Sequence, residues 1–244
     1  MTRHRLDELL VQRGLYFSRS RARDAIARGT VAVDGVVAAK PAQNTRTESR
    51  IEILDEARAY VSRSALKLKS GINFFNISVK GLNCIDIGAS TGGFTQVLLE
   101  QGAAHVTAID VGHGQFDKSL QSHPNVSSIE GLNARDLTTS HLKHKVNFIV
   151  CDVSFISLKL ALPAALSIAE PGAYLVALIK PQFEAGRDAV GRGGIVSDPS
   201  EHARVCKEIS DFLIAENWKV IGLTPSSIEG GDGNREFLIA AVKN

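Results

Sequence analysis

From residue 82 to its end, the chain alternates short apolar runs with longer stretches of helical character. The stretches that favour helices separate most of the apolar runs, and the clearest of them covers residues 199–216. This alternation is typical of a mainly parallel sheet with helices on both faces. We therefore predict an α/β, doubly wound, Rossmann-like fold that binds ligands outside the carboxyl ends of its strands. The predicted strands are 82–87, 106–110, 126–130, 146–152, 174–180, 219–223 and 237–242.

The composition is that of a folded chain. Its 244 residues are 44% hydrophobic and 22% charged, which suits one α/β domain with a small appendage. The longest apolar run, 160–169, is about half the ~20 residues that cross a bilayer, and charges interrupt the first eight residues, where a secretory signal would start. Three widely spaced cysteines support neither a disulfide framework nor a zinc site. We expect a cytoplasmic protein with no membrane segment and no metal.

The first 30 residues are basic, with seven arginines against three acids. Leucines at helical spacing predict a short helix that closes near Gly14, and a second helix begins at Ser18 or Ser20 and ends at Gly29. A hairpin turns at Asp34-Gly35, and a strand returns over 51–54. The sequence therefore predicts a small α+β domain over residues 1–58 and a second domain over 59–244.

The arginines of this head can converge on a phosphate backbone. Taken singly, each is more simply explained as a solvated surface charge. Aromatic side chains are few in this segment, which favours folded RNA over stacking on single strands. The Ser18-Arg-Ser-Arg segment and the Gly29-Thr-Val-Ala-Val-Asp-Gly turn resemble the S4 RNA-binding domain. The predicted RNA-binding residues here are Arg3, Arg5, Arg13, Arg19 and Arg23.

A glycine-rich turn follows the first strand of the larger domain. It reads Asp86-Ile-Gly-Ala-Ser-Thr-Gly-Gly-Phe, and its glycines permit a tight turn and close approach of the backbone to a ligand. Asp110 ends the next strand, where a carboxylate can accept hydrogen bonds from a ribose diol. The glycine spacing is not that of dinucleotide-binding proteins. An adenosyl ligand without phosphates fits better.

Five ordered motifs resemble those of the TlyA family, whose members are often labelled hemolysin A. They begin at Tyr60-Val-Ser-Arg-Ser-Ala-Leu-Lys-Leu, Asp86-Ile-Gly-Ala-Ser-Thr-Gly-Gly-Phe-Thr, Asp152-Val-Ser-Phe-Ile-Ser-Leu, Lys180-Pro-Gln-Phe-Glu and Gly233-Asn-Arg-Glu-Phe. That family joins an S4 domain to an FtsJ-type methyltransferase domain. The resemblance implies S-adenosyl-L-methionine as cofactor, ribosomal RNA or ribosomal subunits as partner, and methylation of a ribose 2′-hydroxyl, with a cytidine as the expected target.

The resemblance also implies which residues form the site. The family's catalytic tetrad corresponds to Lys67, Asp152, Lys180 and Glu236, with Lys180 as the candidate base and the two acids orienting the lysines. Taken alone, each of the four is more simply a surface ion-pair partner. Arg63 is a further predicted RNA contact. The predicted cofactor-binding residues are Asp86, Gly88, Ala89, Ser90, Gly92, Gly93, Phe94, Asp110 and Asp136.

The roles of several residues, and two alternative functions, stay open. Asp136 either reaches the adenine or caps a helix, and Ser64-Ala65 stand where the family usually has two glycines. His113 replaces an aromatic residue and is assigned no chemistry. Two alternative functions remain, a membrane-active hemolysin and a catalytically silent RNA-binding protein. The intact tetrad argues against the second, and the lack of a basic amphipathic stretch with a large apolar face argues against the first.

Overall fold

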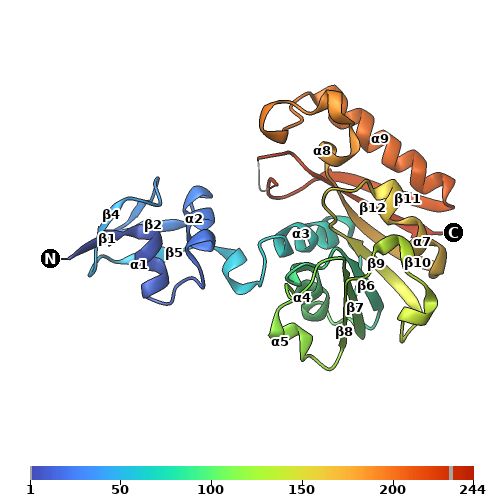
Figure 1. Cartoon of the computed structure of the whole chain (residues 1–244), viewed down its shortest axis with the longest axis horizontal. Helices are drawn as coiled ribbons and strands as arrows, with labels where there is room; N and C mark the ends of the chain where they lie inside the picture. Colours follow the sequence, from blue (N-terminus) through green and yellow to red (C-terminus); the bar gives the residue numbers. More distant parts are fainter. Residues whose placement is uncertain (1, 231–232) are drawn as a thin grey trace. The chain divides into compact units, whose positions relative to one another are not determined.

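The computed structural model describes residues 2–230 and 233–244 and divides the chain into two compact units, residues 1–59 and 60–244. The sequence placed the boundary one residue earlier. We call the first unit the head and the second the body, and each is described by itself. Figure 1 shows both units with their elements labelled.

The head contains two helices and two small antiparallel sheets. Helix α1 (Leu6–Gln12) is followed by α2 (Arg19–Ala27), which begins where the Ser18 hydroxyl accepts a hydrogen bond from the backbone of Arg21. One sheet has the order β3 (Val36–Val37), β2 (Val31–Val33), β5 (Ile51–Ile53). The other pairs β1 (Arg3–Arg5) with β4 (Asn44–Arg46), and a 3₁₀ turn, η1 (Glu56–Ala59), closes the unit. The predicted helices and hairpin are present, whereas β1 and β4 were not predicted.

The body is built on one seven-stranded sheet in the order β11-β12-β10-β9-β6-β7-β8. Neighbouring strands from β10 to β8 pair in parallel, and β12 runs antiparallel to both of its neighbours. The prediction of a mainly parallel, doubly wound sheet is therefore confirmed. The strands are β6 (Asn83–Ile87), β7 (His105–Asp110), β8 (Val126–Glu130), β9 (Val146–Cys151), β10 (Ala169–Ile179), β11 (Trp218–Pro225) and β12 (Phe237–Lys243).

Helices cover both faces of this sheet (Figure 1). On one face, α3 (Ala65–Phe75) and α4 (Gly93–Glu100) bury Leu68, Phe94 and Leu98 in an apolar cluster with the sheet. On the other face, α6 (Leu158–Ala161), α7 (Pro163–Ile168) and α9 (Pro199–Ala215) bury their apolar side chains in a second cluster. Two short helices, α5 (Lys118–Gln121) and α8 (Pro181–Glu184), follow β7 and β10.

The order of the strands creates a point where the chain reverses its direction across the sheet. From β6 the chain proceeds outward to β7 and β8, and it then returns to β9 on the other side of β6. Parallel strands that diverge in this way leave a crevice at their carboxyl ends, because the two connections leave on opposite sides. The ligand site is therefore expected at the carboxyl ends of β6 and β9. The three cysteines, Cys84, Cys151 and Cys206, lie buried as free thiols.

Candidate functional site

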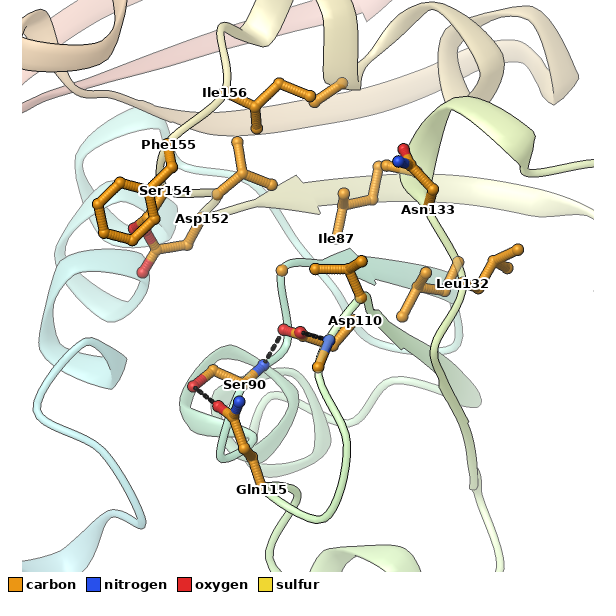
Figure 2. Close-up of a pocket in the computed structure, with 17 residues that line it drawn as sticks. Ile87, Ser90, Asp110, Gln115, Leu132, Asn133, Asp152, Ser154, Phe155 and Ile156 are labelled. Atoms are coloured by element: carbon orange, nitrogen blue, oxygen red, sulfur yellow. Dashed lines mark hydrogen bonds between the residues drawn. The ribbon is translucent and has the colours of Figure 1, made fainter.

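A cavity of about 470 Å³ opens at the carboxyl ends of β6, β7 and β9, and we call it the first cavity. Figure 2 shows Ile87, Asp110 and Ser90 on one side of it, and Asp152, Ser154 and Phe155 on the other. Its wall is mostly apolar with a few polar groups, as is usual for small-molecule sites. The cavity lies where the strand order reverses, as the sheet topology requires.

Asp110 organises the polar side of the first cavity. Its Oδ2 accepts a hydrogen bond from the backbone N–H of Ser90 at 2.7 Å, and its Oδ1 accepts one from Gly112 N at 2.7 Å. Ser90 Oγ in turn lies 3.3 Å from Gln115 Oε1, as the dashed lines in Figure 2 show. Asp110 therefore ties the loop after β6 to the loop after β7, in addition to lining the cavity.

Gly88 lies at the closest approach between two loops of the site. Its φ is +78°, and a Cβ there would lie 2.5 Å from the carbonyl oxygen of Asp152. Any other residue would push the loop after β9 away. Gly92 and Gly93, also predicted as cofactor contacts, do not line the cavities described here. A Cβ on Gly92 would meet Leu120, and one on Gly93 would meet Ser64 Oγ at 2.6 Å, so both glycines serve close packing.

Two of the predicted cofactor-binding acids lie away from the wall. Asp86 is fully buried, accepts a hydrogen bond from Thr95 Oγ1 at 2.7 Å, and does not line the first cavity. Burial raises the pKa of Asp86 to about 7. Asp136 is exposed and also lies outside the wall, whereas Asn133 lines it and caps the 3₁₀ turn 134–136. Asp136 thus neither lines the first cavity nor caps that turn, whereas Asn133 does both.

A second cavity, of about 350 Å³, brings together residues from four segments of the chain. Its charged wall contains Lys67 from α3, Lys180 from the end of β10, and Glu236 from the start of β12. Lys67 Nζ lies 2.5 Å from Glu236 Oε2, and both side chains are buried. Lys180 Nζ lies 2.7 Å from Asp152 Oδ1. The four predicted tetrad residues therefore form two ion pairs at one place.

A third, smaller cavity joins the predicted cofactor loop to Lys180 and Asp152. It is lined by Ser62 and Ser64 together with Ala89, Ser90 and Phe94. Ser62 Oγ and Ser64 Oγ lie 3.0 Å apart. Ser64, which stands where the resembling family usually has glycine, thus faces the cofactor loop.

Sequence reasoning missed several residues of the loops around the two main cavities. Ser154 and Phe155 line both, and Phe155 is 90% exposed with φ at +65°. Gln182 and Phe183 of α8 line the second cavity, and the rings of Phe155 and Phe183 are 5.1 Å apart. The signal that could have found them was their place beside Asp152 and Lys180, in loops that follow parallel strands.

The loops carrying Asp152 and Lys180 are joined by Glu184. Its carboxylate accepts hydrogen bonds from Ser157 Oγ at 2.5 Å and from the backbone of Leu158 at 2.7 Å. Burial raises the pKa of Glu184. This contact holds the loop after β9 against the helix after β10.

In the head, three of the five predicted RNA-binding arginines make structural contacts. Arg5 and Arg19 form ion pairs with the buried carboxylate of Asp7, and Arg13 donates to the backbone carbonyls of Thr47 and Ser49. Burial alone would raise the pKa of Asp7, but the hydrogen bonds from Arg5 and Arg19 hold it below its ordinary value. Arg5 and Arg19 keep about half of their side-chain surface exposed.

Arg3 and Arg23 differ from those three. Both are exposed, and within the described residues neither makes an ion pair. Arg63 precedes α3 in the body, where its backbone carbonyl accepts from Leu66 N. Of the five predicted head arginines, Arg3 and Arg23 are thus the two exposed ones that make neither an ion pair nor a side-chain hydrogen bond within the described residues.

The described residues contain neither a helix that is long and apolar enough to span a membrane nor a group of three metal-ligating side chains.

Replacing Asp110 with alanine removes the acceptor of two backbone N–H groups beside the first cavity. We expect the affinity for S-adenosylmethionine to weaken by about 1–3 kcal/mol, because those donors are left unpaired and the loops separate. Titration calorimetry measures this change. Asp136→Ala is the matched control, since Asp136 lies outside the cavity. Equal affinities for the two variants would contradict the role of Asp110.

Comparisons with known proteins agree with this geometry. Residues 60–243 match the family model of FtsJ-like methyltransferases, and residues 4–51 match that of the S4 domain. The chain is 44% identical to the 16S/23S rRNA (cytidine-2′-O)-methyltransferase TlyA of Mycobacterium tuberculosis, over 97% of this chain and 89% of that protein. It is 40% identical to Hemolysin A of Brachyspira hyodysenteriae, over 96% of this chain and 98% of that protein.

A solved structure from Streptococcus thermophilus that carries a hemolysin name superposes with a TM-score of 0.79 at 40% identity, covering 100% of this chain and 90% of that one. A methyltransferase structure from Listeria monocytogenes, with a TM-score of 0.56 at 12% identity over 74% of this chain and 98% of that one, shares the fold alone. The matches to the two family models and to relatives of nearly the same length indicate the same family. The chain belongs to the FtsJ-like methyltransferases that carry an S4 domain, the group that includes the TlyA proteins.

Proposed function

We propose that this methyltransferase uses S-adenosylmethionine to methylate a ribose 2′-hydroxyl of a cytidine in ribosomal RNA. The observation that carries the proposal is the second cavity, whose wall contains Lys67, Glu236 and Lys180. Asp152 forms an ion pair with Lys180 beside this wall. The first cavity, on the other side of Asp152 and Ser154, has the place and the polar groups to hold the methyl donor. An acceptor in the second cavity would thus lie beside the donor.

The chemistry needs a base as well as close approach. A ribose hydroxyl is a weak nucleophile, and a side chain that takes its proton makes it a better one. S-adenosylmethionine, when bound, supplies the methyl group on a positively charged sulfur. Lys180 is the proposed base, because this residue lines both the second and the third cavity. Asp152 holds Lys180, and Glu236 holds Lys67, which adds positive charge near the acceptor oxygen.

The donor side of the site fits an adenosyl ligand. Asp110 ends β7, where a carboxylate can accept hydrogen bonds from ribose hydroxyls. Gly88, Ala89 and Ser90 bring backbone groups to the cavity edge. Leu132 and Ala134 supply an apolar wall opposite them, suited to an adenine ring.

The direct test incubates the purified protein with methyl-labelled S-adenosylmethionine and separated ribosomal subunits. We expect label in ribosomal RNA, and we expect nuclease digestion followed by chromatography to recover it as 2′-O-methylcytidine. Label on a base, or on another nucleoside, would contradict the proposed position. The absence of label from every subunit would favour the catalytically silent alternative.

Arg23→Ala is expected to weaken the binding of ribosomal RNA and to flatten its salt dependence. Each phosphate contact contributes about one unit to the slope of log affinity against log salt, because binding releases a counterion. Filter binding across a salt series measures the slope. Arg23 is exposed and unpaired within the described residues, so its loss should leave stability unchanged.

Arg19→Ala is the companion variant. It removes partners of Asp7 at 3.0 Å and of Glu8 at 2.9 Å, and should therefore lower the melting temperature of the head. An Arg23→Ala slope equal to that of the unmodified protein would exclude this arginine from the RNA interface.

Some relatives have hemolysin names, so a membrane-active function is the alternative to methyl transfer. Incubation of the purified protein with erythrocytes, followed by measurement of lysis, tests this alternative. The tetrad geometry favours methyl transfer instead, because a lytic protein has no use for two ion pairs gathered beside a cavity. Lysis that persists when Lys180 is replaced would support an independent activity.

A further inference from the structure

Lys180 Nζ has two close oxygen neighbours. Ser154 Oγ lies at 2.8 Å, and Asp152 Oδ1 lies at 2.7 Å. Only the first contact has the direction of a hydrogen bond, because Oδ1 of Asp152 accepts none from any described residue. The carboxylate therefore supplies charge beside the amine, and the Ser154 hydroxyl fixes the direction in which the amine points.

Ser154 stands where the cavities of the site meet. It follows Asp152 by two residues in the loop after β9, and it lines the first, second and third cavities. Lys180 directly follows the neighbouring strand β10 and is 9% exposed. The hydrogen bond thus joins the ends of two adjacent strands at the place where donor and acceptor would come together.

A lysine that takes a proton must first be neutral, and its nitrogen then has two N–H donors and one lone pair. The direction of that lone pair is set by the groups to which the N–H bonds donate. One N–H donates to Ser154 Oγ, and the carboxylate of Asp152 lies beside the nitrogen. Because the negative carboxylate disfavours a lone pair directed toward it, the lone pair faces the cavities that Lys180 lines.

We propose that Ser154 is a positioning residue that aims the lone pair of Lys180 at the acceptor hydroxyl. The inference rests on the proposed function and deepens it. In the step, the ribose O–H bond breaks and its proton forms a bond to Lys180 Nζ. The oxygen takes the methyl carbon as the carbon–sulfur bond breaks, and the sulfur leaves as a neutral thioether.

The test compares Ser154→Ala and Ser154→Thr with the unmodified full-length protein in single turnovers, with saturating methyl donor and ribosomal subunits. We expect Ser154→Ala to be slower by about 10- to 100-fold, because misplaced reacting groups lose most of the advantage of proximity. Its affinity for ribosomal subunits should change much less, because the loss falls on the chemical step. Ser154→Thr keeps the hydroxyl and should recover most of the rate.

Ser157→Ala is the matched control. It removes a hydroxyl from the same loop, where Ser157 Oγ donates to Glu184 and lines none of the three cavities. We expect it to lower thermal stability and to leave the single-turnover rate nearly unchanged. A Ser154→Ala rate equal to that of the unmodified protein, or a loss that threonine does not restore, would overturn the inference. If the unmodified protein transfers no label to ribose, it is the proposed function that fails.

Discussion

Lys180→Met is expected to slow methyl transfer by about 10²- to 10⁴-fold, the usual contribution of a positioned general base. Methionine keeps much of the side-chain bulk but has no nitrogen to take the proton of the acceptor hydroxyl. Affinities for S-adenosylmethionine and for ribosomal RNA should change much less, because the loss falls on the chemical step. Single-turnover rates and separate binding titrations distinguish the two effects.

Lys159→Met is the control for this prediction. Lys159 lies in α6 and pairs with Glu208 at 2.8 Å, with more than a third of its side chain exposed. It lines neither main cavity, so its loss should leave the rate nearly unchanged. If Lys180→Met transferred methyl groups as fast as Lys159→Met, Lys180 would be a structural cation only.

Glu236→Ala is expected to destabilise the body by about 3–5 kcal/mol, because it leaves the buried ammonium of Lys67 without its partner. The pair has 7% and 3% side-chain exposure, so little solvent is available to compensate. Urea unfolding followed by the fluorescence of Trp218 measures the loss. Trp218 is the single tryptophan and is buried in the body, so its signal reports on that unit.

The double variant Lys67→Met/Glu236→Leu separates stability from chemistry. Replacing both members of a buried pair with apolar side chains removes the uncompensated charge, so most of the lost stability should return. Methyl transfer should not return, because the charge next to the acceptor is gone. Recovery of both stability and activity would show that the pair serves folding alone.

Much of the fold could be predicted because its signals are local. Local signals of this kind are the apolar residues at every second position of a strand, the helix cap at Ser18 and the turn at Asp34-Gly35. Each of them acts within a few residues of the chain. The predicted strand 126–130 coincides with β8, and the predicted helix 199–216 extends one residue past α9. The strands β1 and β4 went unnoticed because each has three mostly polar residues and is paired across about 40 residues of chain.

The candidate site, like the fold, was predicted only in part from the sequence. The motifs beginning at Asp86, Asp152 and Lys180 lie at the carboxyl ends of strands, so their shared edge of the sheet could be predicted from the parallel order. Asp136 lies outside the wall of the first cavity, whereas Asn133, which was not predicted, lines it and caps the 3₁₀ turn 134–136. Ser154 carried no signal of its own beyond its position in a motif.

The sequence by itself determined the order of strands and helices along the chain and the basic head, since each depends on neighbours along the chain, and the resemblance to the TlyA family supplied the four tetrad positions. Only the tertiary structure decided which charges meet. Lys67 and Glu236 are 169 residues apart, and Arg19 reaches a carboxylate on another helix, so that it stabilises the head. The physical reason is that ion pairs and hydrogen bonds act over a few ångströms, and folding brings distant residues within that range.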